Sequence, residues 1–418
     1  MNRIIIVGNG FDLAHDLKTK YEDFINWYWG RWLKLLYSST NQIEKDELFE
    51  IRAEYNSDCL SNYFYTSSTE QNVYKHIEKV REGGGLSYIV SPILERISQS
   101  IETKGWVDIE ADYYAMLVER KGKKDELERL NKDFAVIEGL LIEYLNEIQQ
   151  REVNEELCCE QIRNTIFGPV LKKDIAVSSI SKWWSFVESR MKQKGQELTR
   201  MLTPYVDAQY MHIVHKDISD FIARNYERFI IHGKEPVRWP DYFFVPDRIM
   251  LLNFNYTTTA DLYMPGSSRF IVNHIHGELD PQKLNNVIFG YGDESDDEYE
   301  NLKKMNDNEY LRHIKTSRYL ETTKYRDLLS FIESGPFQVV IMGHSCGLSD
   351  RTMLNTLFEH DNCVSIKPYY YVNEQGKDNY LDIVQNISRN FTNPQLMRDR
   401  VVNKTFCEPL PQASKERR

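Results

Sequence analysis

The chain begins with an apolar run that leads directly into a glycine turn. Ile4 to Val7 are followed by Gly8-Asn9-Gly10-Phe11-Asp12, and the pattern predicts a helix from Leu13 onward. A strand that ends in GxG before a helix places backbone N–H groups and the positive helix end opposite a phosphate. The third glycine of GxGxxG is missing because position 13 is leucine, so the dehydrogenase fingerprint is not met.

Later apolar runs predict the rest of a parallel sheet. They lie at 248–254, 270–272, 287–289, 337–342 and about 364–372. Short, continuous apolar runs are typical of strands that are covered on both faces. The sequence therefore predicts an α/β protein with a Rossmann-like, mostly parallel sheet.

The residues between the first turn and the later strands read mostly as helix. Apolar side chains recur every three or four positions at 125–150 and again at 180–229. We therefore expect a split sheet domain, 1–24 plus 240–375, interrupted by an inserted helical module at 25–239. Residues 376–418 are expected to form a C-terminal extension that is partly mobile, above all after about position 393.

The composition argues against several classes of protein. The net charge of -11 disfavours sequence-independent nucleic-acid binding, which depends on Lys and Arg neutralising phosphates. No run approaches the ~20 apolar residues of a membrane helix, and no signal peptide is expected, because its cleavage would remove the glycine turn. The six cysteines show no CxxC spacing, so we expect reduced thiols, a cytoplasmic location and no bound metal.

Small and polar residues follow four of the predicted strands. Because the carboxyl ends of parallel strands meet at one edge of a sheet, we expect these residues to form one binding site. In chain order they are Gly8, Gly10, Phe11 and Asp12; Asn253, Asn255, Tyr256 and Thr257; Asn273, His274, His276 and Gly277; and Gly343, His344, Ser345, Gly347 and Asp350. Each also has a structural interpretation, for example a turn for Asn255 or a helix cap for Asp12.

Several segments, in this order, resemble the bacteriophage abortive infection AbiH family. They are GNGFDLAH at 8–15 with Tyr21 and Phe24, NFNYT at 253–257, IHG at 275–277, IFG at 288–290 and GHSCGLSD at 343–350. GWVDIE at 105–110, which holds Trp106, Asp108 and Glu110, also resembles a segment of that family, and its role stays open. The resemblance covers nearly the whole chain and implies an antiphage protein that acts on phage infection.

AbiH-like proteins are in turn similar to the sirtuin-like domains of antiphage systems, several of which degrade NAD. This resemblance implies that Asn255 and His276 act at the nicotinamide ribose. It assigns nucleotide binding to the two glycine turns and the residues beside them: Gly8, Asn9, Gly10, Phe11, Gly277, Gly343, His344, Ser345 and Asp350. Two features depart from it: Thr257 stands where aspartate is usual, and the four-cysteine zinc module of sirtuins is absent.

The resemblance implies hydrolysis of the N-glycosidic bond of NAD or a related nucleotide, with NAD as substrate and no prosthetic group. The site must stabilise an oxocarbenium-like transition state and position a water. Asn255 can orient that water or the ribose, and His276 can take the proton. Asp12 can bond a ribose hydroxyl or act electrostatically. Because unrestrained NAD hydrolysis would kill the host, a phage-derived trigger is expected, together with a homo-oligomer.

Other interpretations remain open from the sequence. The sheet domain can be a nucleotide-binding sensor whose helical module acts on a partner protein or nucleic acid. GHSCG at 343–347 has the form of a hydrolase nucleophile elbow, for which His360 is the downstream histidine. His274 and His276, with Asp280, form a weak metal pattern, and His15 lies one helical turn from Asp12 as a possible dyad partner.

Overall fold

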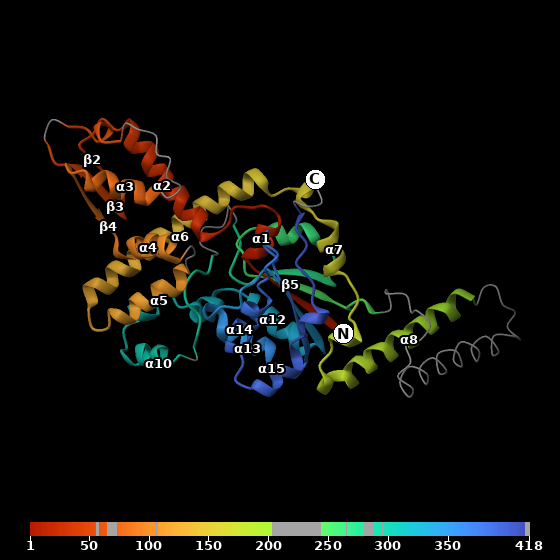
Figure 1. Cartoon of the computed structure of the whole chain (residues 1–418). Coiled ribbons are helices and arrows are strands. Elements are labelled where there is room, and N and C mark those ends of the chain that lie inside the picture. Colours follow the sequence, from red (N-terminus) through yellow and green to blue (C-terminus); the bar gives the residue numbers. More distant parts are fainter. Residues whose placement is uncertain are drawn as a thin grey trace, which may run out of the picture.

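The protein, described here by a computed structural model, is an α/β protein whose described residues form two sheets (Figure 1). The structure describes residues 1–55, 58–64, 73–104, 108–202, 244–264, 266–279, 287–294 and 296–413. Within these ranges, no helix is both long and apolar enough to cross a bilayer.

A five-stranded parallel sheet forms the centre of the molecule. Its strands are β1 (Asn2–Val7), β5 (Ile249–Asn253), β6 (Phe270–His274), β7 (Phe337–Met342) and β8 (Cys363–Tyr369), in the spatial order β6-β5-β1-β7-β8. Val7 lies opposite Asn253 on one side and Met342 on the other, so these three strands end at the same level. The strand order reverses beside β1, and open α/β sheets bind their ligands at the carboxyl ends of the strands at such a reversal.

Both faces of this sheet are covered, as its continuous apolar strands predict. Ile4 and Ile6 point to one face, and Ile5 and Val7 to the other, which is the two-residue period of a strand. The first face is covered by α12 (Lys324–Glu333), α13 (Arg351–Phe358), α14 (Tyr380–Arg389) and α15 (Pro394–Arg400). The second is covered by α1 (Asn9–Ala14) and α7 (Glu160–Ile166).

The C-terminal residues belong to this packing. Met397 of helix α15 and Val401, the residue after that helix, pack against the core that includes β8, and Leu410 is buried beside α1 and α7. Residues 394–413 therefore cover the sheet, and the mobility expected after about position 393 stays a prediction.

The region predicted as a helical module also contains a three-stranded antiparallel sheet that the sequence analysis missed. Its strands are β2 (Ile43–Lys45), β3 (Phe49–Ala53) and β4 (Leu86–Val90), in the order β2-β3-β4. Helices α2 (Tyr21–Ser38), α3 (Val73–Glu82), α4 (Pro92–Lys104), α5 (Ile109–Glu119) and α6 (Lys124–Glu152) share one apolar core with it. The strands have three to five residues and β2 is largely exposed, so their periodic pattern is too short to stand out.

One segment from between the strands of the main sheet packs in the core of the inserted module. Residues 287–314, with α10 (Asp297–Lys304), come between strands of the main sheet, yet Phe289, Leu302 and Ile314 lie in the module's core. Residues 287–289 are not a strand, contrary to the prediction, although the Ile288 N–H donates to the His276 carbonyl at 2.7 Å. The boundaries at 24/25 and 239/240 stay predictions.

Helix α8 (Ile180–Leu202) extends away from the sheet on the side opposite the antiparallel sheet (Figure 1). Its first turns are anchored, since Trp183 and Phe186 are buried against Met1 and Val364. The remainder of the helix predicted at 180–229 lies outside the described residues.

Candidate functional site

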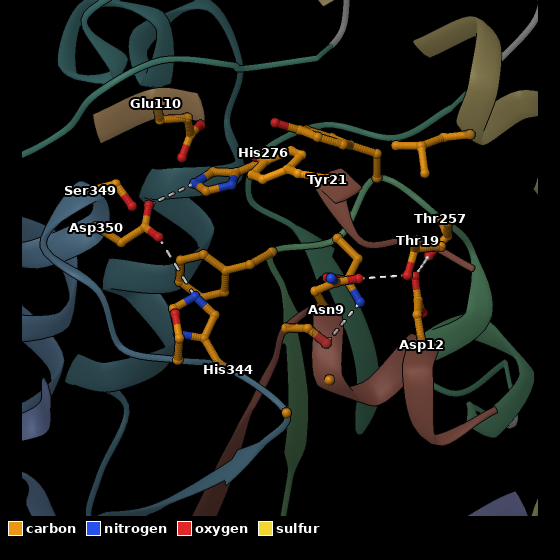
Figure 2. A pocket seen from close by; sticks show the side chains of 18 of the residues that line it. Asn9, Asp12, Thr19, Tyr21, Glu110, Thr257, His276, His344, Ser349 and Asp350 are labelled. Carbon is orange, nitrogen blue, oxygen red and sulfur yellow. Dashed lines mark hydrogen bonds and ion pairs between the residues drawn. The ribbon is translucent and has the colours of Figure 1, made fainter. Parts of the chain in front are cut away.

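A cavity of about 430 Å³ lies at the carboxyl ends of the strands, where their order reverses. Its polar lining falls into two groups, shown at opposite ends of the view in Figure 2. One group holds Asn9, Asp12, Thr19 and Thr257. The other holds Glu110, His276, His344, Ser349 and Asp350.

Asp12 is the centre of the first group. Its side chain is 1% exposed, and its Oδ2 accepts a hydrogen bond from Thr257 Oγ1 at 2.6 Å. Its Oδ1 accepts no hydrogen bond of normal geometry from the residues that the structure describes. Burial raises the pKa of Asp12 to about 6, against the opposing effect of the Thr257 hydroxyl. Asp12 therefore exchanges a proton close to neutral pH.

The two glycine turns lie against each other. The Gly10 N–H donates to the Gly343 carbonyl and the Phe11 N–H to the Gly8 carbonyl, both at 2.8 Å. A Cβ on Gly8 would lie 2.5 Å from His344 Cα, and Gly343 has a φ of 75°, in the region that favours glycine. The glycines thus allow the turns after β1 and β7 to pack closely. The amides of Gly10 and Phe11 both donate within the protein, and the phosphate-binding role of this turn stays a prediction.

Asn255 connects the end of β5 to the end of β1. Its Nδ2 donates to the Gly8 carbonyl at 3.0 Å, and its N–H donates to Asn253 Oδ1 at 3.0 Å. The Asn255 side chain also acts with the hydroxyls of Thr257 and Thr259 to oppose the rise in the pKa of Asp12. Asn255 therefore both fixes the strand ends and faces the Asp12 carboxyl.

Asp350 is the centre of the second group. Lys315 Nζ, which is fully buried, lies 2.8 Å from Asp350 Oδ1 and 3.2 Å from Glu110 Oε2. His276 Nε2 lies 3.2 Å from Asp350 Oδ1, and His344 Nε2 lies 3.6 Å from Oδ2. Burial by itself would raise the pKa of Asp350, but Lys315 and His276 hold it well below its usual range. Asp350 is therefore a permanent negative charge in the cavity wall.

The two imidazoles have different hydrogen-bond partners. His344 Nδ1 accepts from the Cys346 N–H at 3.0 Å, so the neutral ring carries its proton on Nε2, which faces Asp350. His276 Nε2 also lies 3.0 Å from the Tyr319 hydroxyl. Burial, followed by the charge of Lys315, lowers the pKa of His276 to about 4, so this ring is neutral at pH 7.

The start of α5 brings two further carboxylates to the cavity. Asp108 is the N-cap of α5, and Glu110 lies in its first turn, where it pairs with Lys315. Burial raises the pKa of both carboxyl groups. With Asp12 and Asp350, the described lining thus holds four carboxyl groups and no lysine or arginine.

The match to known families spans this whole arrangement. The family described as Bacteriophage abortive infection AbiH matches residues 4–371, from the first strand of the main sheet to its last. The chain belongs to the AbiH family. This membership supports an antiphage role in abortive infection. No curated protein and no solved structure matches the chain.

In this AbiH-family chain, most of the residues predicted for the site line the one cavity. They are Gly8, Asn9, Gly10, Asp12, Asn255, His276, Gly343, His344, Ser345 and Asp350. Tyr256 and Thr257 line it as well, whereas Phe11, Gly277, Asn253, Asn273, His274 and Gly347 do not. Phe11 points into the core under α1, where its ring lies 5.7 Å from that of Tyr263, and Gly277 forms a turn after β6 with a φ of 84°.

The geometry contradicts the esterase-like interpretation. His360 packs on the ring of Phe337 at the start of β7, whereas Ser345 follows the end of that strand. A strand of this length spans roughly 20 Å. Ser345 and His360 therefore lie at opposite edges of the sheet and cannot exchange a proton.

The other histidines also have separate partners. His274 Nε2 lies 3.0 Å from Asp261, while His276 contacts Asp350, so the two do not converge on one ligand. Asp280, the third residue of that metal pattern, lies outside the described residues, as does Trp106. His15 is buried, and its Nε2 lies 2.6 Å from the Tyr263 hydroxyl in the core.

Sequence reasoning missed Lys315 and Tyr319. Lys315 lies in the short helix α11 (Lys315–Arg318) within a polar stretch, which reads as exposed surface. The available signal was indirect: the acidic residues of the 105–110 and 343–350 segments, once placed in one site, require a buried cation. No pattern in the linear sequence identifies which lysine provides it.

Proposed function

We propose that this protein hydrolyses the N-glycosidic bond of NAD or a related nucleotide in the acidic cavity. The observation that carries the proposal is Asp12, a buried carboxyl group with one oxygen left without a hydrogen bond, beside Asn255 in the cavity wall. Its pKa, raised to about 6, suits a group that takes a proton from water near neutral pH.

The strand order supports a nucleotide as the substrate. Numbered along the chain, the parallel strands lie in the order third, second, first, fourth and fifth, which is the order of a Rossmann-like sheet. Such sheets bind nucleotides at the point where the order reverses, and the acidic cavity lies there. The Rossmann-like and sirtuin-like character of the domain is part of this proposal.

The charge of the cavity supports a cationic leaving group. Nicotinamide is positively charged while it is bonded to ribose, and the charge moves to the sugar in an oxocarbenium-like transition state. Asp350 stays ionised beside Lys315, whereas burial raises the pKa of Asp12. Carboxyl groups with separated pKa values can divide charge stabilisation and proton transfer between them.

In the proposed reaction, water attacks the anomeric carbon of the ribose as the bond to nicotinamide breaks. The bonding electron pair leaves with nicotinamide, which becomes neutral, and the proton of the water passes to the Asp12 carboxylate. Asp12 then returns that proton to solvent, so the products from NAD are ADP-ribose, nicotinamide and H⁺. Asn255 positions Asp12, and the neutral His276 holds the Asp350 carboxylate toward the sugar.

A specific observation favours a second function, that of a nucleotide-binding sensor. Asn255 Nδ2 and His276 Nε2 both have partners within the protein already, as in a site that holds a ligand without transforming it. The inserted module would then act on a partner protein or nucleic acid once the nucleotide is bound. A phage-derived trigger, a homo-oligomer and a cytoplasmic location are part of either proposal.

The nucleotide content of phage-infected cells that express the full chain separates the two functions. We expect NAD to fall and ADP-ribose to appear with the wild type, and neither change with Asp12→Asn or His276→Ala. His360→Ala is the matched control, because it removes a histidine at the opposite edge of the same sheet. Arrest of infection with intact NAD would reject hydrolysis and favour the sensor. If NAD is still lost in cells that express Asp12→Asn, Asp12 does not accept the proton in the hydrolysis.

A further inference from the structure

A second cavity shares a wall with the acidic cavity. It has a volume of about 800 Å³ and lies over the ends of β7 and β8, on the other side of the strand reversal. Gly10, Gly343, His344 and Ser345 line both cavities. A ligand that is longer than either cavity can therefore extend across the turn after β7.

The segment after α1 forms another part of this wall. Thr19 and Tyr21 line the acidic cavity, whereas Lys18 and Lys20 line the second cavity. Successive side chains of an extended segment point to opposite sides, and this alternation separates the two linings. Thr19 is buried and donates to Asn9, while both lysines are exposed.

The two linings differ in charge. The acidic cavity has four carboxyl groups and, in its described lining, no lysine or arginine. The second cavity has Lys18 and Lys20 together with the acidic Asp16, Asp23 and Glu374. Within the described linings, ammonium groups occur only on the second side, so an anionic group that crosses the shared wall can pair with a lysine there.

The second cavity also has surfaces that suit a planar base. Tyr369, at the end of β8, and the half-exposed Tyr371 line it, together with apolar Leu17, Ile383 and Leu410. Aromatic side chains stack on nucleobases, with a gain of roughly 1–3 kcal/mol per base. This pairing of lysines with tyrosines fits a nucleoside that carries a diphosphate.

We propose that the second cavity binds the diphosphate and nucleoside half of a dinucleotide whose other ribose lies in the acidic cavity. The diphosphate crosses the wall at Gly10 and Ser345 and pairs with Lys18 and Lys20, and the base packs on Tyr371. This assignment rests on the proposed function for the identity of the whole substrate. Binding in the second cavity, however, can be measured without any reaction.

Titration calorimetry of the full chain with ADP tests the binding directly. We expect one ADP per chain, and affinity at least about tenfold weaker in the double variant Lys18→Ala/Lys20→Ala, since each lysine makes a charge-assisted contact. Lys34→Ala/Lys45→Ala is the matched control, because it removes two exposed lysines from α2 and β2. Asp12→Asn should bind ADP like the wild type, since Asp12 lines only the other cavity.

Several results would overturn the assignment. They are the absence of ADP binding to the wild type, equal binding by the two double variants, or binding of inorganic diphosphate as tight as that of ADP. Thermal unfolding of the Lys18→Ala/Lys20→Ala variant should match that of the wild type, because both side chains are exposed.

Turnover separates this inference from the proposed function. With NAD, the Lys18→Ala/Lys20→Ala variant should show a KM raised at least about tenfold, while its KM for nicotinamide riboside, which has no diphosphate, stays unchanged. Equal effects on both substrates would overturn the assignment. If the wild type cleaves neither substrate but binds ADP as described, the proposed hydrolysis is wrong, whereas the assignment of nucleotide binding to the second cavity is kept.

Discussion

Replacement of Asp12 by asparagine should stabilise the protein at pH 8 and abolish the proposed NAD hydrolysis. The pKa of Asp12 is about 6 in the folded state, against 3.8 for an aspartate in its ordinary environment. That difference of about 2.2 pH units corresponds to about 3 kcal/mol at 1.36 kcal/mol per unit. Because Asp12 is fully buried, solvent screening does not reduce this figure.

The sign follows from proton linkage. The folded state binds the Asp12 proton more tightly than the unfolded state, so ionisation of Asp12 destabilises the fold as the pH rises through 6. The penalty is complete at pH 8, about half as large at pH 5, and gone below about pH 3.8, where both states are protonated. Asparagine carries no charge at any of these values and can still accept the Thr257 hydrogen bond.

Urea unfolding of the wild type and Asp12→Asn at pH 8 and pH 5 measures the effect. We expect the variant to be more stable by about 3 kcal/mol at pH 8 and by roughly half of that at pH 5. Asp361→Asn is the control, since it removes an exposed carboxylate, and it should change the free energy of unfolding by less than about 0.5 kcal/mol. A variant that is less stable than the wild type at pH 8, or a difference that does not change with pH, would refute the reasoning.

Three further outcomes are expected. Gly343→Ala should lower the free energy of unfolding in the urea assay by about 3 kcal/mol, because its Cβ would lie 2.1 Å from Phe11 N at a left-handed φ. The control Gly139→Ala, in α6, has no atom within 4 Å of its Cβ and should raise the free energy of unfolding by up to about 1 kcal/mol. Ser345→Ala should keep the kcat of the proposed NAD hydrolysis in a nicotinamide-release assay, with any effect confined to KM, because Ser345 lies where the proposed diphosphate crosses the wall; loss of kcat would revive the nucleophile interpretation. Lys315→Met should cost about 3–5 kcal/mol in thermal or urea unfolding, since it leaves two buried carboxyl groups without their cation; an unchanged midpoint would contradict the ion-pair assignment.

The strands of the main sheet could be predicted because the information lies in short runs of sequence. Continuous apolar runs identified β1, β5, β6, β7 and β8, and a glycine or polar turn marked the end of most of them. The run at 287–289 has the same composition but joins the core of the inserted module. The apolar composition of a segment predicts that it is buried, but it does not predict which other segment it packs against.

The candidate site was predicted in part for a similar reason. The carboxyl ends of parallel strands share one edge, so the residues after the strands had to meet, and Asp12, Asn255 and His276 do line one cavity. Phe11 was misplaced because a one-residue rotation along α1 turns a side chain by about 100°. The glycines of the first turn were predicted to bind a phosphate, and in the structure they lie against the turn after β7.

The sequence by itself determined the class of fold, the order of the site segments along the chain and the family to which the chain belongs. The tertiary structure alone decided that Lys315 holds Asp350 ionised, that burial raises the pKa of Asp12 to about 6, and that residues 18–21 separate two cavities lined by different charged groups. The physical reason is that strand formation depends on neighbours in the chain. The charge state of a buried group depends on its neighbours in space, and those come from segments hundreds of residues apart.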